Sequence, residues 1–318
     1  MTGAHDGGRM SDLLQIRDLV VEYPVGGGRR VHAVSGVTVA VRKGETLGLV
    51  GESGSGKSSL ARALLQLPPP QGGSVQFDGQ DLTKLGGKAL RAVRPRLQMI
   101  FQDPIASLNP RRRVAEIIAE PLIVCGVADA AERTRRVRAV MEAVGLDPDL
   151  VWNRRPHEFS GGQCQRIAIA RALVLEPSLI VCDEPVSALD VSIRAQILNL
   201  LEDMKARFGL TLLFIAHDLA VVKSVSDRVA VMYLGKLCEV ASSEDLFASP
   251  AHPYTAALMA AIPEPDPDIP LGDTKLPPSG CRFRTRCPHA EKRCTSEVPA
   301  LREIAPGREV ACHFPLVA

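Results

Sequence analysis

Residues 51–58, GESGSGKS, constrain the fold of this chain more than any other segment. They fit the pattern G-x-x-x-x-G-K-[ST], with a short apolar run at 46–50 before them and a helical pattern after them. Glycines let backbone N–H groups curl around phosphate oxygens, and the start of the following helix directs a positive partial charge at the same anion. A strand, a glycine-rich loop and a helix in this order predict a nucleotide-binding site.

The side chains of this loop are a cation, hydroxyls and glycines. We expect Lys57 to neutralise the β- and γ-phosphates of ATP and Ser58 to offer its hydroxyl to Mg²⁺. The other residues expected to touch the nucleotide are Gly51, Ser53, Gly54, Ser55, Gly56 and Ser59. A chance match is the competing interpretation, at about one in a hundred for a chain of this length and ordinary glycine content. The strand and helix on either side argue against it.

Polar residues follow three further apolar runs. Asp183 and Glu184 end the run LIVC, where a strand of an open α/β sheet meets its ligands. Asp183 suits Mg²⁺, directly or through water, and Glu184 is placed to orient or deprotonate an attacking water. Gln102 and His217 end two other apolar runs, from which Gln102 could reach Mg²⁺ or water and His217 a γ-phosphate. Taken alone, each could be an ordinary surface residue.

A second helix N-terminus that could bind an anion is predicted at 159–163, FSGGQ. Ser160, Gly161, Gly162 and Gln163 precede the helical pattern CQRIAIARALVL. The chain therefore has two helix N-termini suited to bind phosphate, but it has only one phosphate loop with its lysine, Lys57. This imbalance is explained if the second helix start serves the nucleotide of another subunit.

The remaining pattern predicts an α/β fold with a mostly parallel sheet. Strand-like runs at 13–24 and 31–42, joined by a glycine turn, predict an N-terminal antiparallel part. Strand and helix alternate later in the chain, which implies a parallel sheet covered on both faces. The expected divisions are a flexible tail at 1–11, a nucleotide-binding domain at 12–245 with a helical insert at about 103–165, and an extension at 246–318 that begins near a Pro-rich linker.

Six motifs in order, GESGSGKS, FQDP, FSGGQ, LIVCDEP, SALD and AHD, resemble the ATP-binding cassette (ABC) family over residues 12–245. The resemblance implies a P-loop NTPase cassette and a head-to-tail pair of cassettes with two ATP molecules between them. Each ATP would contact the phosphate loop of one subunit and residues 160–163 of the other. Phe159 departs from the leucine that is commoner there, but it keeps an apolar residue before Ser160.

The resemblance also implies individual roles. Glu184 corresponds to the general base and His217 to the residue that clamps the γ-phosphate and the water. Gln102 corresponds to the link between Mg²⁺ and the transmembrane partner. Asp190 lies in the loop that touches the opposite subunit, and Tyr23 is similar to the aromatic residue that stacks on adenine, although it could simply pack.

The segments FQDPIASLNPR, CDEPVSALDVSIRAQILNLL and SPAHPYTAALMAAIP resemble the oligopeptide, dipeptide and nickel importer branch of the family. This implies a peptide importer ATPase, with nickel or another small solute as the alternative cargo. Its partners would be a second cassette (a sister chain or a copy of itself), two transmembrane permease subunits and an extracytoplasmic peptide-binding protein. The expected location is peripheral, on the cytoplasmic face of the inner membrane, since no run of about 18 apolar residues is present.

Two other function classes fit less well. A soluble cassette protein acting on ribosomes or nucleic acid commonly has two phosphate loops, a long coiled coil or a strongly basic surface. This chain has one phosphate loop and a net charge of +2, so no nucleic-acid partner is expected. A small-molecule kinase would share the phosphate loop but would not explain FSGGQ.

Four of the eight cysteines, Cys281, Cys287, Cys294 and Cys312, lie in the last 38 residues. They are separated by five, six and seventeen residues. Thiolates suit zinc or an iron–sulfur cluster, and zinc sites usually have about two to four residues between paired cysteines. The wider spacing favours a [4Fe–4S] cluster, which the branch resemblance also implies for some members. Zinc, and plain thiols or disulfides, remain open alternatives.

Overall fold

The computed structural model describes residues 11–26, 29–260 and 279–317. The predicted flexible tail at 1–11, apart from Ser11, and the Pro-rich linker at 262–270 lie outside the described residues. Within the described ranges, no helix has the length and apolar character needed to cross a membrane.

The main sheet has eight strands in the order β11-β12-β10-β9-β3-β8-β7-β6. Five neighbouring strands are parallel: β9 (Arg228–Tyr233), β3 (Thr46–Val50), β8 (Thr211–Ala216), β7 (Leu179–Asp183) and β6 (Leu97–Ile100). Every residue of β3, β7 and β8 is buried, because helices cover one face of the sheet and α1 with the second sheet covers the other. The predicted parallel core is confirmed.

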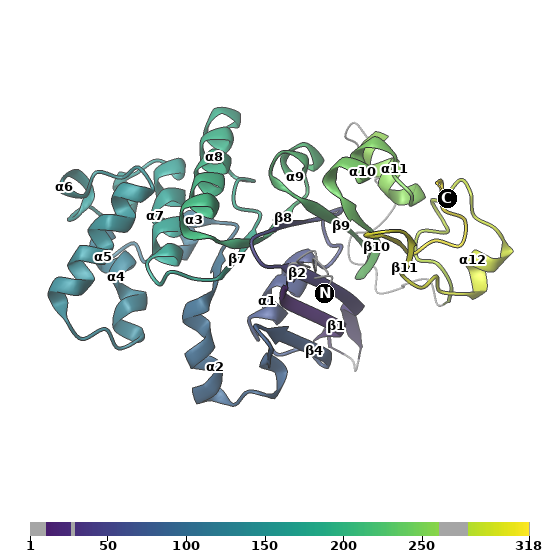
Figure 1. The fold of residues 1–318 in the computed structure, drawn as a ribbon, viewed down its shortest axis with the longest axis horizontal. Helices are drawn as coiled ribbons and strands as arrows, with labels where there is room; N and C mark the ends of the chain where they lie inside the picture. Colours follow the sequence, from purple (N-terminus) through teal and green to yellow (C-terminus); the bar gives the residue numbers. More distant parts are fainter. Residues whose placement is uncertain (1–10, 27–28, 261–278, 318) are drawn as a thin grey trace, which may run out of the picture.

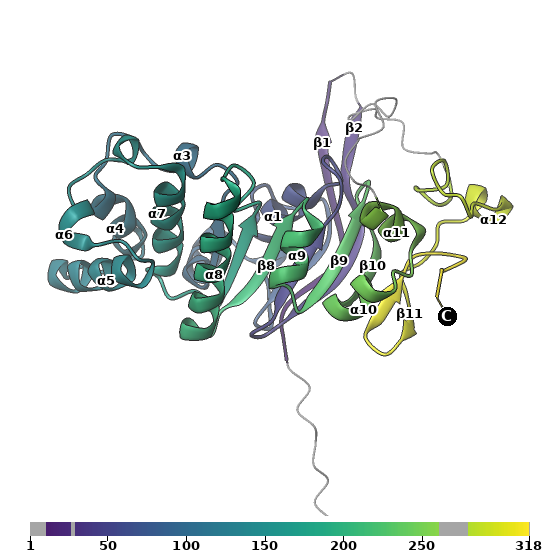
Figure 2. The same cartoon turned by 90° about the horizontal axis from the view of Figure 1, so that it is seen from above.

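A second, antiparallel sheet has the order β2-β1-β4-β5. Its strands are β1 (Asp12–Pro24), β2 (Arg30–Arg42), β4 (Gly72–Phe77) and β5 (Gln80–Asp81). The helix α1 (Lys57–Leu64) packs between the two sheets, where Leu60 and Leu64 share an apolar core with Val181 and Leu213 of the main sheet. The predicted N-terminal hairpin is confirmed, and Figure 2 shows it extending beyond the main sheet.

A helical lobe lies at one end of the molecule (Figure 1). It contains α3 (Pro104–Ser107), α4 (Val114–Val124), α5 (Ala130–Ala143), α6 (Pro148–Val151) and α7 (Gly161–Leu173). Both α4 and α5 lie within the range of about 103–165 in which a helical insert is expected. Val114 and Ile118 of α4 and Val137 and Met141 of α5 are buried in one core, at the i, i+4 spacing that places residues on one face of a helix.

The C-terminal extension is joined to the cassette through the main sheet. Strand β12 (Arg308–Val310) pairs antiparallel with β10 (Lys236–Ser242) and with β11 (Arg302–Ala305). The fully buried carboxylate of Glu239 accepts hydrogen bonds from the N–H groups of Ala251 and His252, and it pairs with Arg308 at 3.2 Å. No pattern in the sequence predicts the strands β11 and β12.

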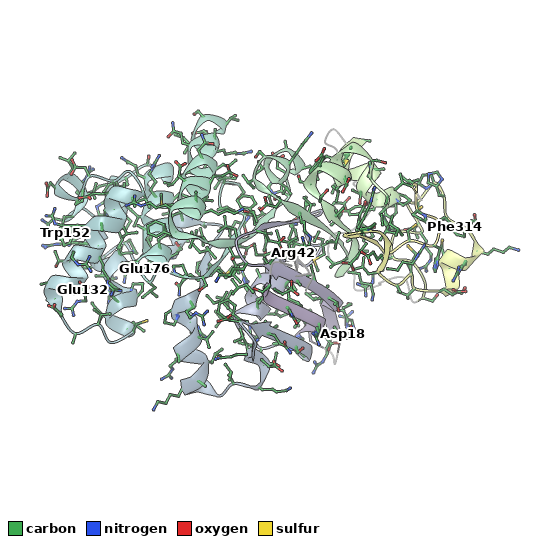
Figure 3. All side chains as sticks on the ribbon, in the orientation of Figure 1. Asp18, Arg42, Glu132, Trp152, Glu176 and Phe314 are labelled. Carbon is green, nitrogen blue, oxygen red and sulfur yellow. The ribbon has the colours of Figure 1, made fainter. Side chains whose placement is uncertain are left out.

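The remaining helices surround these sheets. They are α2 (Gly87–Val93), α8 (Val191–Phe208), α9 (Leu219–Val225), α10 (Ser243–Ala248), α11 (Pro253–Ala260), α12 (Lys292–Ser296) and the 3-10 turns Leu82–Lys84, Arg94–Arg96 and Pro156–Glu158. Figure 3 labels Trp152 in the helical lobe and Phe314 in the extension, at opposite ends of the molecule. The site described next lies between these two ends.

Candidate nucleotide-binding site

The phosphate loop runs from the end of β3 to the start of α1, as predicted. Its glycines are required by close backbone contacts. A Cβ at Gly51 would lie 2.0 Å from the carbonyl oxygen of Met232, and a Cβ at Gly56 would lie 2.1 Å from that of Ala33. Gly56 also has φ of +106°, a conformation that other residues rarely adopt. The loop is therefore a backbone cradle that a larger residue would distort.

Lys57 is buried at the base of this loop. Its Nζ donates to the carbonyl oxygens of Gly51 at 2.7 Å and Glu52 at 2.9 Å. Burial lowers the pKa of Lys57, while the negative charges of Glu184, Asp183 and Glu52 oppose that shift. The buried hydroxyl of Ser55 has no hydrogen-bond partner among the described residues. A buried cation, an unpaired hydroxyl and a glycine cradle together fit a phosphate group.

Asp183 and Ser58 meet beside the loop. The hydroxyl of Ser58 donates to Oδ1 of Asp183 at 2.8 Å, across 125 residues of sequence. Burial raises the pKa of Asp183, and the Ser58 hydrogen bond and the charges of Arg62 and Lys57 act in the opposite direction. A hydroxyl next to a carboxylate at the end of a strand is a donor set that fits Mg²⁺.

Two of the predicted site residues, Gln102 and His217, converge on one oxygen atom of a third, Glu184. Nε2 of Gln102 donates to Oε2 of Glu184 at 3.2 Å, and Nδ1 of His217 lies 3.1 Å from the same oxygen. The residues follow β6, β7 and β8, which are neighbouring parallel strands, so their carboxyl ends reach the same edge of the sheet. Such an edge is where open α/β sheets bind ligands.

The backbone holds Glu184 in a constrained position. Its φ is +49°, which is uncommon for a residue with a Cβ. Its N–H donates to the carbonyl oxygen of Ile215 at 3.0 Å, and the hydroxyl of Ser187 donates to the Glu184 carbonyl at 3.0 Å. The Glu184 side chain is 14% exposed, which leaves it reachable by water while its direction is fixed.

The segment 160–163 begins α7 and lies against the start of α8. Ser160 and Gln163 form reciprocal hydrogen bonds, with the Ser160 N–H donating to Oε1 of Gln163 at 3.0 Å. A Cβ at Gly162 would lie 2.6 Å from Cγ2 of Ile193, three residues beyond Asp190. Among the described residues, no hydrogen bond connects this segment to the phosphate loop, and α7 and α1 lie apart in Figures 1 and 2.

Tyr23 lies on β1 opposite Val31 of β2 and is half-buried against the core of the antiparallel sheet. Ala33, two residues beyond Val31, directs its carbonyl oxygen at Gly56. The hairpin thus approaches the phosphate loop at Ala33, two positions along β2 from the residue opposite Tyr23.

A cleft of about 620 Å³ lies beside Gln102. Phe101 is 39% exposed at its edge, and the cations Arg62, Arg94 and Arg171 line it together with Asp103. The cleft lies between the sheet edge and the helical lobe, because its lining comes from β6, α1, α3, α4 and α7.

Comparison with known proteins identifies the family. Residues 34–187 match the ABC transporter family, and residues 238–294 match the C-terminal region of oligopeptide and dipeptide transporters. The oligopeptide transport ATP-binding protein OppF of Salmonella typhimurium is 53% identical over 309 residues, which cover 91% of this chain and 92% of that protein. The chain belongs to the ABC transporter family. OppF of Escherichia coli is similar to this ABC chain to nearly the same extent, with 52% identity over the same shares of both chains.

A solved cassette structure has the same fold as this ABC chain. The ATP-binding cassette MJ0796, described as a dimer in a post-hydrolysis state bound to ADP and Pi, superposes with a TM-score of 0.66. It is 28% identical and covers 72% of this chain and 98% of its own. The cassette fold predicted from the six motifs is therefore confirmed.

The four C-terminal cysteines of this ABC chain line one small cavity. Its lining includes Cys281, Cys287, Cys294 and Cys312, together with His252, Phe283, His289 and His313. Burial raises the pKa values of Cys281, Cys287 and Cys312. In the described part of the chain, no three His, Cys, Asp or Glu side chains form a group that could hold a metal ion.

Two residues that no sequence motif indicates hold the phosphate loop from the C-terminal side. Arg286 pairs with Glu52 at 3.0 Å, and the hydroxyl of Tyr254 accepts a hydrogen bond from the Glu52 N–H at 3.1 Å. More than 200 residues separate Glu52 from each partner, and no motif spacing indicates such contacts.

Proposed function

We propose that this chain is the ATP-hydrolysing subunit of an ABC importer for dipeptides and oligopeptides. The observation that carries the proposal is the convergence of Gln102 and His217 on one carboxylate oxygen of Glu184, next to the strand that holds Asp183. This arrangement directs a base and two polar side chains at the edge of the sheet where the phosphate loop lies. A merely structural ion pair would not need a Gln, a Glu and a His from three separate strands.

In the proposed mechanism, ATP is the substrate and the phosphate loop binds it. Lys57 and the backbone N–H groups of residues 51–58 hold the phosphates. Mg²⁺ would be held by Ser58, Asp183 and Gln102, and it would offset charge on the phosphates. Glu184 orients a water molecule and accepts its proton while the water oxygen bonds to the γ-phosphorus. The bond from that phosphorus to the β–γ bridging oxygen breaks, which yields ADP and phosphate.

The other site residues complete this scheme. His217 fixes the Glu184 carboxylate and reaches the γ-phosphate, Gln102 connects the site to the adjoining cleft, and Tyr23 stacks on adenine. The nucleotide of a second cassette is bound by Ser160, Gly161, Gly162 and Gln163. Asp190 contacts the same second cassette. The dimer described for MJ0796 supports a site shared by two cassettes.

The substitution Glu184→Gln tests the proposed activity. It removes the base but keeps the shape of the side chain, so we expect ATP binding to remain and steady-state hydrolysis to fall by at least about a hundredfold. Glu132→Gln is the matched control: this half-buried carboxylate of α5 pairs with Arg135 and Arg136 in the helical lobe, and its variant should hydrolyse ATP at the wild-type rate. Undiminished hydrolysis in the Glu184 variant would remove this residue from the mechanism.

Peptide cargo rests on the relatives and on the matched C-terminal region. The proposed partners are a second cassette (sister chain or copy), two transmembrane permease subunits and an extracytoplasmic peptide-binding protein. The chain would be peripheral, on the cytoplasmic face of the inner membrane, with the cleft beside Gln102 as the permease contact. Uptake of labelled di- and oligopeptides into vesicles that contain the complete transporter tests the cargo, and ATP-dependent nickel uptake instead would favour the alternative.

The division of the chain and the cysteine site are also proposals. Residues 12–245 would form the nucleotide-binding domain, with its helical insert at about 103–165, and residues 246–318 the extension. The four cysteines would hold a [4Fe–4S] cluster, with zinc as the alternative. One observation supports the proposal: four thiols, the ligands that such clusters take, line one cavity. Its role would be structural.

A further inference from the structure

Glu52 is an acidic residue inside a loop built to bind anions, and two C-terminal residues hold it. Nη1 of Arg286 lies 3.0 Å from both carboxylate oxygens of Glu52. The hydroxyl of Tyr254 accepts a hydrogen bond from the Glu52 N–H at 3.1 Å. Tyr254 is 1% exposed, so this backbone contact is protected from water. The carboxylate and the backbone of Glu52 are therefore both fixed from the same side.

Aromatic rings hold the guanidinium of Arg286 in place. The ring centroids of Tyr233, Tyr254 and Phe283 are 4.5–5.4 Å apart. The guanidinium carbon of Arg286 lies 6.0 Å from the Tyr233 centroid and 5.8 Å from the Phe283 centroid. Cations are attracted to ring faces, and a side chain already held in position loses less entropy when it pairs with a carboxylate.

The segment 281–287 also reaches the phosphate loop by a second route. Arg282 donates a hydrogen bond to the carbonyl oxygen of Leu234, in the turn between β9 and β10. In the same turn the Gly235 N–H donates to the carbonyl oxygen of Ser55 at 2.8 Å. The two ends of the segment, Cys281 and Cys287, line the cysteine cavity. One short segment therefore joins that cavity to two points of the phosphate loop.

We infer that Arg286 is a positioning residue for the phosphate loop: it neutralises and holds the carboxylate of Glu52, so that the C-terminal extension sets the affinity of the cassette for nucleotide. The inference rests on the proposed ATPase function. An uncompensated carboxylate in this loop would repel the triphosphate. Since Arg286 acts through Glu52 and not on Glu184, its loss weakens nucleotide binding and leaves the chemical step unchanged.

The full-length variant Arg286→Gln tests this inference against Arg293→Gln. Arg293 lies in the same extension and forms an exposed pair with Glu297 at 2.7 Å, away from the phosphate loop. Calorimetric titration with ATP and ADP gives affinities, and steady-state kinetics give kcat and KM. We expect Arg286→Gln to weaken ATP binding and raise KM by about three- to tenfold, with kcat within about twofold of wild type. Arg293→Gln should match wild type in all three quantities.

The double variant Glu52→Gln/Arg286→Gln separates positioning from general support of the fold. It leaves no unpaired carboxylate, so we expect ATP affinity to return to within about twofold of wild type. If Arg286→Gln alone fails to fold, the double variant still tests whether the unpaired carboxylate of Glu52 is what weakens ATP binding. Wild-type affinity in Arg286→Gln, a fall in kcat without a change in KM, or a lost affinity that the double variant does not restore would each overturn the inference. A wild-type chain that binds no ATP would instead overturn the proposed function.

Discussion

Nδ1 of His217 lies 3.1 Å from Oε2 of Glu184, the oxygen to which Gln102 also donates a hydrogen bond. His217 is 56% exposed, whereas the Glu184 side chain is 14% exposed. The carboxylate is thus largely shielded from solvent, whereas the imidazole that contacts it is open to solvent. A histidine in this position can contact both the base and a γ-phosphate.

His217→Ala should lower kcat for ATP hydrolysis by about a hundredfold, because it removes a hydrogen-bonding group from the charge that develops in the transition state. Binding of ADP, which lacks the γ-phosphate, should stay within about twofold of wild type. Phosphate-release assays and ADP titration on one preparation measure both quantities. Equal losses of ADP and ATP affinity would assign His217 to the fold and not to the γ-phosphate.

Gly56→Ala should abolish nucleotide binding and lower the free energy of unfolding by about 1–3 kcal/mol. The added Cβ would lie 2.1 Å from the carbonyl oxygen of Ala33, and the residue would keep a positive φ. Gly86→Ala is the matched control, because Gly86 has φ of −75° and nothing within 4 Å of its added Cβ. Urea unfolding and ATP titration measure the two effects, and similar values for the two variants would contradict the steric argument.

Glu239→Gln should lower the free energy of unfolding by about 3–5 kcal/mol, because it removes a fully buried carboxylate and leaves the largely buried guanidinium of Arg308 without its charge partner. Arg293→Gln should cost less than about 1 kcal/mol, since its pair with Glu297 is exposed. Chemical unfolding followed by circular dichroism gives both values. A small loss for the Glu239 variant would show that the extension does not depend on this ion pair.

Anaerobically purified protein should contain iron and show a broad visible absorption band if the four cysteines hold a cluster. Cys287→Ser should lose both signals, because Cys287 lines the cysteine cavity. Cys125→Ser is the control, since Cys125 is exposed on the helical lobe and should leave the iron content unchanged. A colourless protein with one zinc per chain would end the cluster hypothesis.

The sequence by itself determined the cassette fold and the residues at its sheet edge. The glycine pattern at 51–58, the acidic pair that ends β7 and the polar residues that end β6 and β8 are local features. Because the carboxyl ends of neighbouring parallel strands meet at one edge, these local features were enough to predict that Gln102, Glu184 and His217 share a site.

Only the tertiary structure decided how the C-terminal extension meets that site. The contacts of Glu52 with Tyr254 and Arg286 span 202 and 234 residues. The pairing of β12 with β10 extends the main sheet by strands that the sequence periodicity did not predict. Periodicity and motif spacing report only the residues near each other in the chain. Contacts across such separations depend on how the sheet edge, the β9–β10 turn and the aromatic cluster pack in space, which no local pattern encodes.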